Sequence, residues 1–487
     1  MKSQKVSIKK NFIMEIFLTM SNFIFPLITF PYVSRILKPE GTGKVQFATA
    51  AVSYFLIIAQ LGIPKYGIRA CAKVRDNREE LSRTAHELLM INLIMTAIAY
   101  AGLFLSILFV PKFQDEKALL IIISLSIIFS TIGMEWLYKG LEKYTYITIR
   151  AVIFKFVALI AMFLLVHEED DYIIYGAITI LASSCSSIFN LIHARKYIST
   201  KPVENYNLKK HMKAVVVFFA MACATTVYTH LVTLMLGFMK TDVDVGYYHA
   251  AVKIKTILVS IVISLGTVLL PRASYYVQNG KMDEFHNITK KSLNFAVLLS
   301  TPLMIYFIFF ARAGILLLSG SAFESAVLPM QLIMPTLLLI GMSNVTGIQI
   351  LVPTGREKYV LYSEIAGAIV DLILNAILIP RYSSAGAAIG TLVAEVVVLL
   401  VQIAFLRKEA AAIFKKVSYL KMFVALAGGL AGSVWVLWMN WNSFFTLLVS
   451  GILFFCIYGG LLLIQKEPLV NNIKDQLMNP IKRKLGK

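Results

Sequence analysis

Charge is scarce in this 487-residue chain, in which Asp, Glu, Lys and Arg together make up only 15% of the residues. Soluble domains carry about 25% charged residues, whereas this chain is 58% hydrophobic. The shortage of charge excludes an ordinary soluble domain. Apolar runs of about 20 residues, each long enough to cross ~30 Å of hydrocarbon as a helix, recur along the whole sequence. The composition therefore predicts an all-α integral membrane protein.

Cysteine is rare as well, because the chain has only four cysteines and they lie far apart. No two of them form a Cys-x-x-Cys pair, and three fall within apolar runs. This spacing excludes a disulfide scaffold and a cysteine-based metal site. We expect Cys71, Cys185, Cys223 and Cys456 to be small packing residues, and we expect no metal site.

A nucleotide-binding loop is also missing. The segment Gly41–Lys44 reads GTGK, but a P-loop requires glycine five positions before its final Gly-Lys pair and Ser or Thr directly after the lysine. Lys38 and Val45 occupy those two positions. The sequence therefore predicts no ATP site, and we expect no cofactor other than an ion gradient.

The apolar runs predict fourteen transmembrane helices. The first run follows a basic start, but it is too long for the core of a signal peptide and lacks a small-residue cleavage site, so we expect it to stay in the protein. The predicted spans are 12–34, 45–66, 86–110, 118–138, 147–166, 172–193, 214–239, 246–270, 292–311, 328–352, 360–379, 386–406, 421–440 and 443–464.

The basic residues are distributed unevenly between the predicted loops. Of the 47 Lys and Arg residues, 36 fall on the side of the N-terminus and eight on the opposite side, while three lie within spans. This is the positive-inside pattern, and it predicts that both termini are cytoplasmic. The formal net charge of +20 is therefore explained by membrane topology, and we expect no nucleic-acid partner.

Two short motifs occur twice in the same order. GLEKY begins at Gly140 and GREKY at Gly355, and an IGM triplet precedes each copy, at 132–134 and at 340–342. A further match joins GKVQFATAA, from residue 43, to GYYHAAVKI, from residue 246. In each case the second copy follows the first after nearly the same number of residues. This spacing predicts a six-helix unit that occurs twice in the sequence. Because six is even, both copies insert in the same orientation and form a parallel repeat with a pseudo-two-fold axis.

The repeat divides the predicted protein into three parts. We expect an N-terminal lobe at 1–213 with helices 1 to 6, and a C-terminal lobe at 214–420 with helices 7 to 12. Helices 13 and 14 and a basic cytoplasmic tail follow at 421–487.

The segment Phe25–Asp76 resembles the start of bacterial polysaccharide repeat-unit flippases of the Wzx type. These belong to the multidrug/oligosaccharidyl-lipid/polysaccharide (MOP) exporter superfamily. One departure is Lys38, where the family has a small residue. The resemblance spans nearly the whole chain, and the motifs that carry it are PYVSR at 31–35, PEG at 39–41, LGIP at 61–64, YGIR at 66–69, VGYYHAAVKI from 245 and PTGREKY from 353.

The resemblance implies two six-helix lobes in a V shape around a central cavity. It implies transport of undecaprenyl-pyrophosphate-linked oligosaccharide repeat units across the cytoplasmic membrane, for capsule, O-antigen or exopolysaccharide synthesis. The energy would come from a proton or sodium gradient through alternating access. The expected surroundings are membrane lipids and the polysaccharide polymerase and chain-length machinery, and the protein is expected to be a monomer in the cytoplasmic membrane.

A pyrophosphate that crosses the membrane needs cations inside it, and a charge at that depth costs at least about 2.5 kcal/mol. Lys155 lies near the middle of span 147–166, and Lys253 lies in a family motif. Arg35 ends the first span within PYVSR, and Lys65 and Arg69 share one helical face at the cytoplasmic end of the second span. We predict that these five residues bind substrate; snorkelling, ion pairing and positive-inside anchoring remain the structural alternatives.

Carboxylates within the spans are candidates for ion coupling. Asp371 lies in the middle of span 360–379, seven residues after Glu364 and four before Asn375, which places the three on one helical face. Glu395 lies in the middle of the following span. We predict that Asp371, Glu395 and Glu364 bind a proton or a sodium ion; structural pairing with a buried lysine or with polar neighbours is the alternative.

Three other functions compete with the flippase. A multidrug/cation antiporter of the same superfamily would favour an acidic, aromatic cavity, which the membrane lysines oppose. A peptidoglycan-precursor lipid flippase is a close variant. A membrane enzyme would need a large external loop or an acidic catalytic cluster with a scaffold, and the predicted external loops are short, so we expect no catalytic residues.

Overall fold

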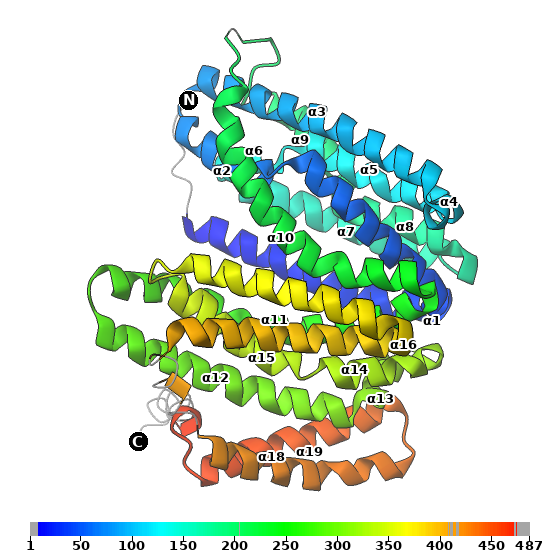
Figure 1. The fold of residues 1–487 in the computed structure, drawn as a ribbon, viewed down its shortest axis with the longest axis vertical. Coiled ribbons are helices and arrows are strands. Elements are labelled where there is room, and N and C mark those ends of the chain that lie inside the picture. Colours follow the sequence, from blue (N-terminus) through cyan, green and yellow to red (C-terminus); the bar gives the residue numbers. More distant parts are fainter. Residues whose placement is uncertain are drawn as a thin grey trace, which may run out of the picture. The chain divides into compact units, whose positions relative to one another are not determined.

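The chain folds into helices joined by short turns, as the composition predicted (Figure 1). This computed structural model describes residues 8–203, 205–407, 409, 413–414, 418–471 and 474, and these contain no β-strand. The many long apolar helices make it a multi-pass membrane protein. The prediction of an all-α membrane protein is therefore confirmed.

Within the described residues, eleven helices are long and apolar enough to cross a membrane, or twelve if one bent pair counts as a single span. Two of them are long enough for two crossings each: α1 has 53 residues with non-helical backbone at Lys38, and α16 has 50 with non-helical backbone at Ser383. These breaks lie between predicted spans 1 and 2 and between spans 11 and 12. The count of fourteen spans stays a prediction.

The described chain forms two compact units, Met1–Gly246 and Tyr247–Lys487. Helix α10, which the repeat places at the start of the second lobe, packs against α1 and α2 in the first unit (Figure 1). The predicted lobes at 1–213 and 214–420, with 421–487 after them, stay a prediction.

The helices of the first unit are α1 (Ile8–Gln60), α2 (Ile63–Val74), α3 (Arg78–Phe109), α4 (Pro111–Asp115), α5 (Lys117–Gly133), α6 (Glu135–Gly140), α7 (Tyr144–Leu165), α8 (Tyr172–Ile180), α9 (Ser187–Ala194) and α10 (Lys209–Met239), with short helices η1 (Glu169–Asp171) and η2 (Leu181–Cys185).

Two breaks in the helices of the first unit are each satisfied by an asparagine from a neighbouring helix. The chain adopts positive φ at Leu61 and Gly62, and the amide of Asn92 on α3 donates to the Ala59 carbonyl at 2.8 Å. In the same way, the Asn190 amide on α9 donates to the Gly133 carbonyl at 2.7 Å, where α5 ends. Backbone groups at membrane depth need such partners because lipid offers none.

A buried carboxylate fastens the start of α10 to the first unit. Glu87 on α3 is 0% exposed and accepts hydrogen bonds from the Asn207 backbone N–H at 2.7 Å, Lys210 Nζ at 2.7 Å and His211 Nε2 at 2.8 Å. The second ring nitrogen of His211 lies 2.7 Å from the Tyr66 hydroxyl on α2. Both oxygens of Glu87 are thus satisfied, as a buried charge requires.

Replacing Glu87 by alanine is expected to destabilise the protein by about 3–5 kcal/mol, because it leaves Lys210 and His211 without their buried partner. Thermal unfolding in detergent measures the change. Glu79→Ala on the same helix is the control, since it removes only an exposed i,i+4 pair with Arg83, worth about 0.3–0.5 kcal/mol. Equal effects of the two substitutions would contradict the role of Glu87.

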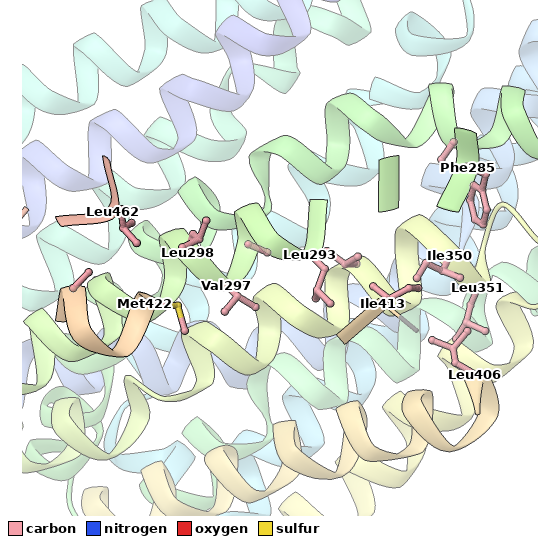
Figure 2. Packing of buried hydrophobic residues seen from close by; sticks show 14 of the residues in the cluster. Phe285, Leu293, Val297, Leu298, Ile350, Leu351, Leu406, Ile413, Met422 and Leu462 are labelled. Atoms are coloured by element: carbon pink, nitrogen blue, oxygen red, sulfur yellow. The ribbon is translucent and has the colours of Figure 1, made fainter. Parts of the chain in front are cut away.

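The second unit packs around the cluster in Figure 2, where α12, α16 and the last two helices meet. Leu298 of α12, Met422 of α18 and Leu462 of α19 belong to this cluster. The last two helices therefore share the core of this unit.

The helices of the second unit are α11 (Asp242–Gln278, which begins in the first unit), α12 (Met282–Phe309), α13 (Ala311–Ser319), η3 (Ser321–Ala326), α14 (Val327–Ile333), α15 (Thr336–Ser343), the π-helix η4 (Asn344–Leu351), α16 (Glu357–Leu406), α18 (Tyr419–Ser433), η5 (Val434–Met439) and α19 (Ser443–Ile464).

Candidate functional site

Lys155 lies at the centre of α7, whose 22 residues span Tyr144–Leu165. Its Nζ donates to the Ser21 hydroxyl at 2.7 Å and to the Asn22 side-chain oxygen at 2.5 Å, both on α1, and lies 6.0 Å from the ring centroid of Phe25. Among the residues that the structure describes, no carboxylate oxygen lies within 4.0 Å of this nitrogen. The half-buried ammonium is therefore held by neutral groups.

The other cations predicted in the first unit lie on exposed faces. Arg35 is exposed near the end of the first arm of α1, and one guanidinium nitrogen donates to the Pro31 carbonyl at 2.5 Å. Lys65 and Arg69 are exposed on α2, whose opposite face is buried. The two share one stripe, as their spacing predicted.

Lys253 and Lys255 on α11 differ in their surroundings. Lys253 is half-buried, and its charge acts on the His249 side chain one turn earlier. Lys255 is influenced by the charges of Glu395 and Asp371. A two-residue step turns an α-helix by about 200°, so the two lysines point to different sides. The role of Lys253 in substrate binding stays a prediction.

The two carboxylates predicted in the middle of their spans are buried on the two arms of α16. Asp371 is 3% exposed and Glu395 is 6% exposed. The amide of Asn375, one turn after Asp371, donates to its carboxylate at 2.8 Å. Gly390 on the second arm leaves room for this amide, since a Cβ there would collide with it. The predicted pairing of Asp371 with Asn375 on one face is therefore seen.

Two residues that were not predicted lie near these carboxylates. The hydroxyls of Tyr248 on α11 and Thr391 on the second arm of α16 are 2.9 Å apart. The charges of Asp371 and Glu395 both act on Tyr248. The side-chain oxygen of Asn375 is buried, and no hydrogen-bond partner for it is found in the described part of the chain. Polar residues within apolar spans were the signal that could have identified this group.

Glu364 differs from these two carboxylates in its exposure. It is exposed, whereas Asp371 two turns later on the same arm is buried. Of the three predicted carboxylates, Asp371 and Glu395 are therefore buried and Glu364 is exposed. The neighbouring Ser363 is buried instead, and its hydroxyl accepts a hydrogen bond from Gln402 at 3.1 Å.

The arrangement combines two kinds of electrostatic site. The first unit presents a membrane lysine whose charge is not neutralised by a nearby carboxylate. The second unit buries two carboxylates, one of which accepts a hydrogen bond from the Asn375 amide. The first suits an anion, and the second suits a small cation, which carboxylate and carbonyl-type oxygens bind. Groups of at least three His, Cys, Asp or Glu residues that could hold a metal ion are not found within the described residues.

Comparison with known proteins gives relatives along nearly the whole chain. The chain is 24% identical over 412 residues to a protein of Escherichia coli strain K12 named as a candidate O-antigen transporter, covering 84% of this chain and 99% of that protein. A protein of Shigella dysenteriae with the same name is 27% identical over 409 residues, covering 80% and 98%.

Two solved structures share the fold. The lipid II flippase MurJ, in an inward closed conformation, matches with a TM-score of 0.69 and 17% identity, over 96% of this chain and 99% of that chain. A multidrug resistance MATE family transporter of the MOP superfamily, in an inward-facing conformation, matches with a TM-score of 0.61 and 13% identity, over 80% and 95%. At these identities the likeness concerns the fold alone.

Family matches agree with the resemblance found in the sequence. The MatE family matches residues 218–377. The polysaccharide biosynthesis protein family matches residues 8–277, which is more than half of the chain. The resemblance to polysaccharide flippases of the MOP superfamily is thereby confirmed, and the chain belongs to the polysaccharide biosynthesis protein family.

Proposed function

We propose that this protein is a flippase that moves undecaprenyl-pyrophosphate-linked oligosaccharide repeat units across the cytoplasmic membrane, for capsule, O-antigen or exopolysaccharide synthesis. Family membership and the two bacterial relatives support this proposal. The observation that carries it is Lys155, a membrane lysine at the centre of its helix with only neutral groups at its ammonium. Such a charge is expensive at this depth and indicates a bound anion.

The cations act on the diphosphate in succession. Lys65 and Arg69 on the exposed stripe of α2 attract it at the cytoplasmic surface. Lys155 and Lys253 then replace water as partners of the phosphate oxygens within the membrane, and Arg35 binds them near the outer surface through its forked guanidinium. The covalent structure of the cargo does not change, so no catalytic residue takes part.

The carboxylates of the second unit couple this movement to an ion gradient. Asp371 and Glu395 are buried on the two arms of α16. A proton or a sodium ion that enters would neutralise carboxylate charge, and the two states of this group would favour different arrangements of the helices. The coupling ion is thus a second cargo, and no further cofactor is required.

Both termini lie in the cytoplasm of the producing cell, and the protein acts as a monomer beside the polymerase and chain-length machinery.

Cysteine labelling tests the orientation in a variant without native cysteines. An impermeant reagent applied to intact cells is expected to label Asp170→Cys and to leave Asp76→Cys and Glu142→Cys unlabelled until the cells are opened. Labelling of position 76 but not 170 in intact cells would reverse the topology.

The cargo is tested by deleting the gene in its own host. The expected result is that repeat units attached to undecaprenyl pyrophosphate accumulate while surface polysaccharide disappears, and that the wild-type gene restores both. Accumulation of the peptidoglycan precursor would instead assign the protein to that pathway. Unchanged lipid-linked pools together with raised drug sensitivity would indicate a multidrug antiporter.

A further inference from the structure

The ammonium of Lys155 rests on two oxygen acceptors of defined orientation. The Ser21 hydroxyl donates its own proton to the Leu18 carbonyl at 2.7 Å, so it presents a lone pair to Lys155. The Asn22 side-chain oxygen is the second acceptor. An ammonium has three N–H donors and no acceptor. Two donors are therefore occupied by α1, and for the third, which a ligand can take, no acceptor is found among the described residues.

Neutral partners distinguish Lys155 from three lysines of the same unit that have carboxylate partners. Lys112 binds Asp242 at 2.7 Å, Lys210 binds Glu87 at 2.7 Å, and Lys139 binds Glu135 at 3.0 Å. Each of these charges is cancelled by a carboxylate. At Lys155 a hydroxyl and an amide orient the ammonium without neutralising its charge.

That remaining charge decides what the site can bind. Opposite charges attract far more strongly in a poorly polarisable environment than in water, so an uncancelled cation at membrane depth favours an anion. A carboxylate at the position of the Asn22 amide would hold the lysine equally well and would remove this attraction. An amide at this position therefore lets the site bind an anion, whereas a carboxylate would prevent it.

We propose that Asn22 and Ser21 determine the anion specificity of the Lys155 site. They hold the ammonium against α1 without neutralising it, and its third N–H binds a phosphoryl oxygen of the cargo's diphosphate. This inference rests on the proposed function and adds to it the residues that set the charge of the site.

The nearly isosteric substitution Asn22→Asp separates this role from a structural one. If Asn22 only anchors Lys155, a carboxylate should anchor it as well or better, and function should persist. If Asn22 preserves the charge, Asn22→Asp should weaken the binding of inorganic pyrophosphate to the purified protein at least tenfold and abolish export, with protein level and thermal stability unchanged. Asn22→Leu, which removes the acceptor without adding charge, should retain more binding than Asn22→Asp.

Two further variants complete the set. Asn22→Ser keeps a neutral acceptor and should bind pyrophosphate within a few-fold of the wild type. Asn442→Asp adds the same charge at the start of α19, where the side chain accepts a hydrogen bond from the Phe445 N–H, and should bind as the wild type does. Wild-type binding by Asn22→Asp, or no binding by the wild-type protein itself, would overturn the proposal.

The source of the phosphate is tested by competition. Phosphatidylglycerol in mixed micelles should not displace pyrophosphate at comparable concentration, whereas displacement would assign the site to phospholipid phosphate and overturn its assignment to the cargo. The purified protein also separates this inference from the proposed function. Loss of pyrophosphate binding in Asn22→Asp would support the anion site even if gene deletion left lipid-linked oligosaccharides unchanged.

Discussion

Surface polysaccharide is expected to fall about a hundredfold when Lys155 is replaced by methionine, in a deletion strain that carries the variant gene. Methionine keeps an unbranched chain of similar length and removes only the charge. A hydrogen bond to a charged group contributes up to about 3 kcal/mol, which corresponds to roughly a hundredfold in an equilibrium constant. Because the lysine has no carboxylate partner within 4.0 Å among the described residues, its loss leaves no buried counter-charge behind, and the protein should stay folded.

Three comparisons make this result specific. Lys155→Arg should keep partial export, since it retains the charge in a different shape. Lys117→Met at an exposed position of α5 should export normally. Lys253→Ala is expected to abolish export as well. The measurements are surface polysaccharide and protein level by blot, and full export by the combined Lys155→Ala and Lys253→Ala variant would show that the cationic path is wrong.

The second large effect concerns the coupling group. Asp371→Asn preserves the volume and the hydrogen bond to Asn375 but removes the charge that a proton or sodium ion would neutralise. Export should slow at least tenfold, while the purified protein binds pyrophosphate as the wild type does. The rate of cargo translocation in vesicles with an imposed proton or sodium gradient measures this, and the variant should lose its response to the gradient.

Burial provides the matched control for this prediction. Glu364 lies two turns from Asp371 on the same arm of α16 but is exposed, so Glu364→Gln should leave the gradient response intact. Glu395→Gln, at the other buried carboxylate, should behave as Asp371→Asn does. A normal gradient response by Asp371→Asn would remove this residue from the coupling group and leave Glu395 as the remaining candidate.

The local parts of this structure could be predicted because they depend on nearby residues. Lys155 lies at the centre of its helix because the apolar run extends similarly on both sides of it, and Asp371 meets Asn375 because a four-residue step returns to the same helical face. The stripe of Lys65 and Arg69 follows from the same spacing.

The partners across helices could not be predicted. Lys155 is 134 residues from Ser21 and 133 from Asn22. Neither α1 residue is charged, so nothing in the apolar run indicates that it has a functional role. Spacing also could not show that Asp371 is buried and Glu364 exposed. Both lie on one helical face, and only the packing of neighbouring helices determines which turns of that face are buried.

The bond between Glu87 and His211 has a consequence for the synthesis of the protein. The two residues are 124 positions apart, and a ribosome adds about 5–20 residues per second. Helix α3 is therefore made roughly 6–25 s before the partners of its glutamate exist. During that interval the insertion machinery or water at the bilayer surface must keep Glu87 solvated. The first unit cannot close until the start of α10 arrives, so a nascent chain that stalls before residue 209 would expose a charged helix to the cell's membrane proteases.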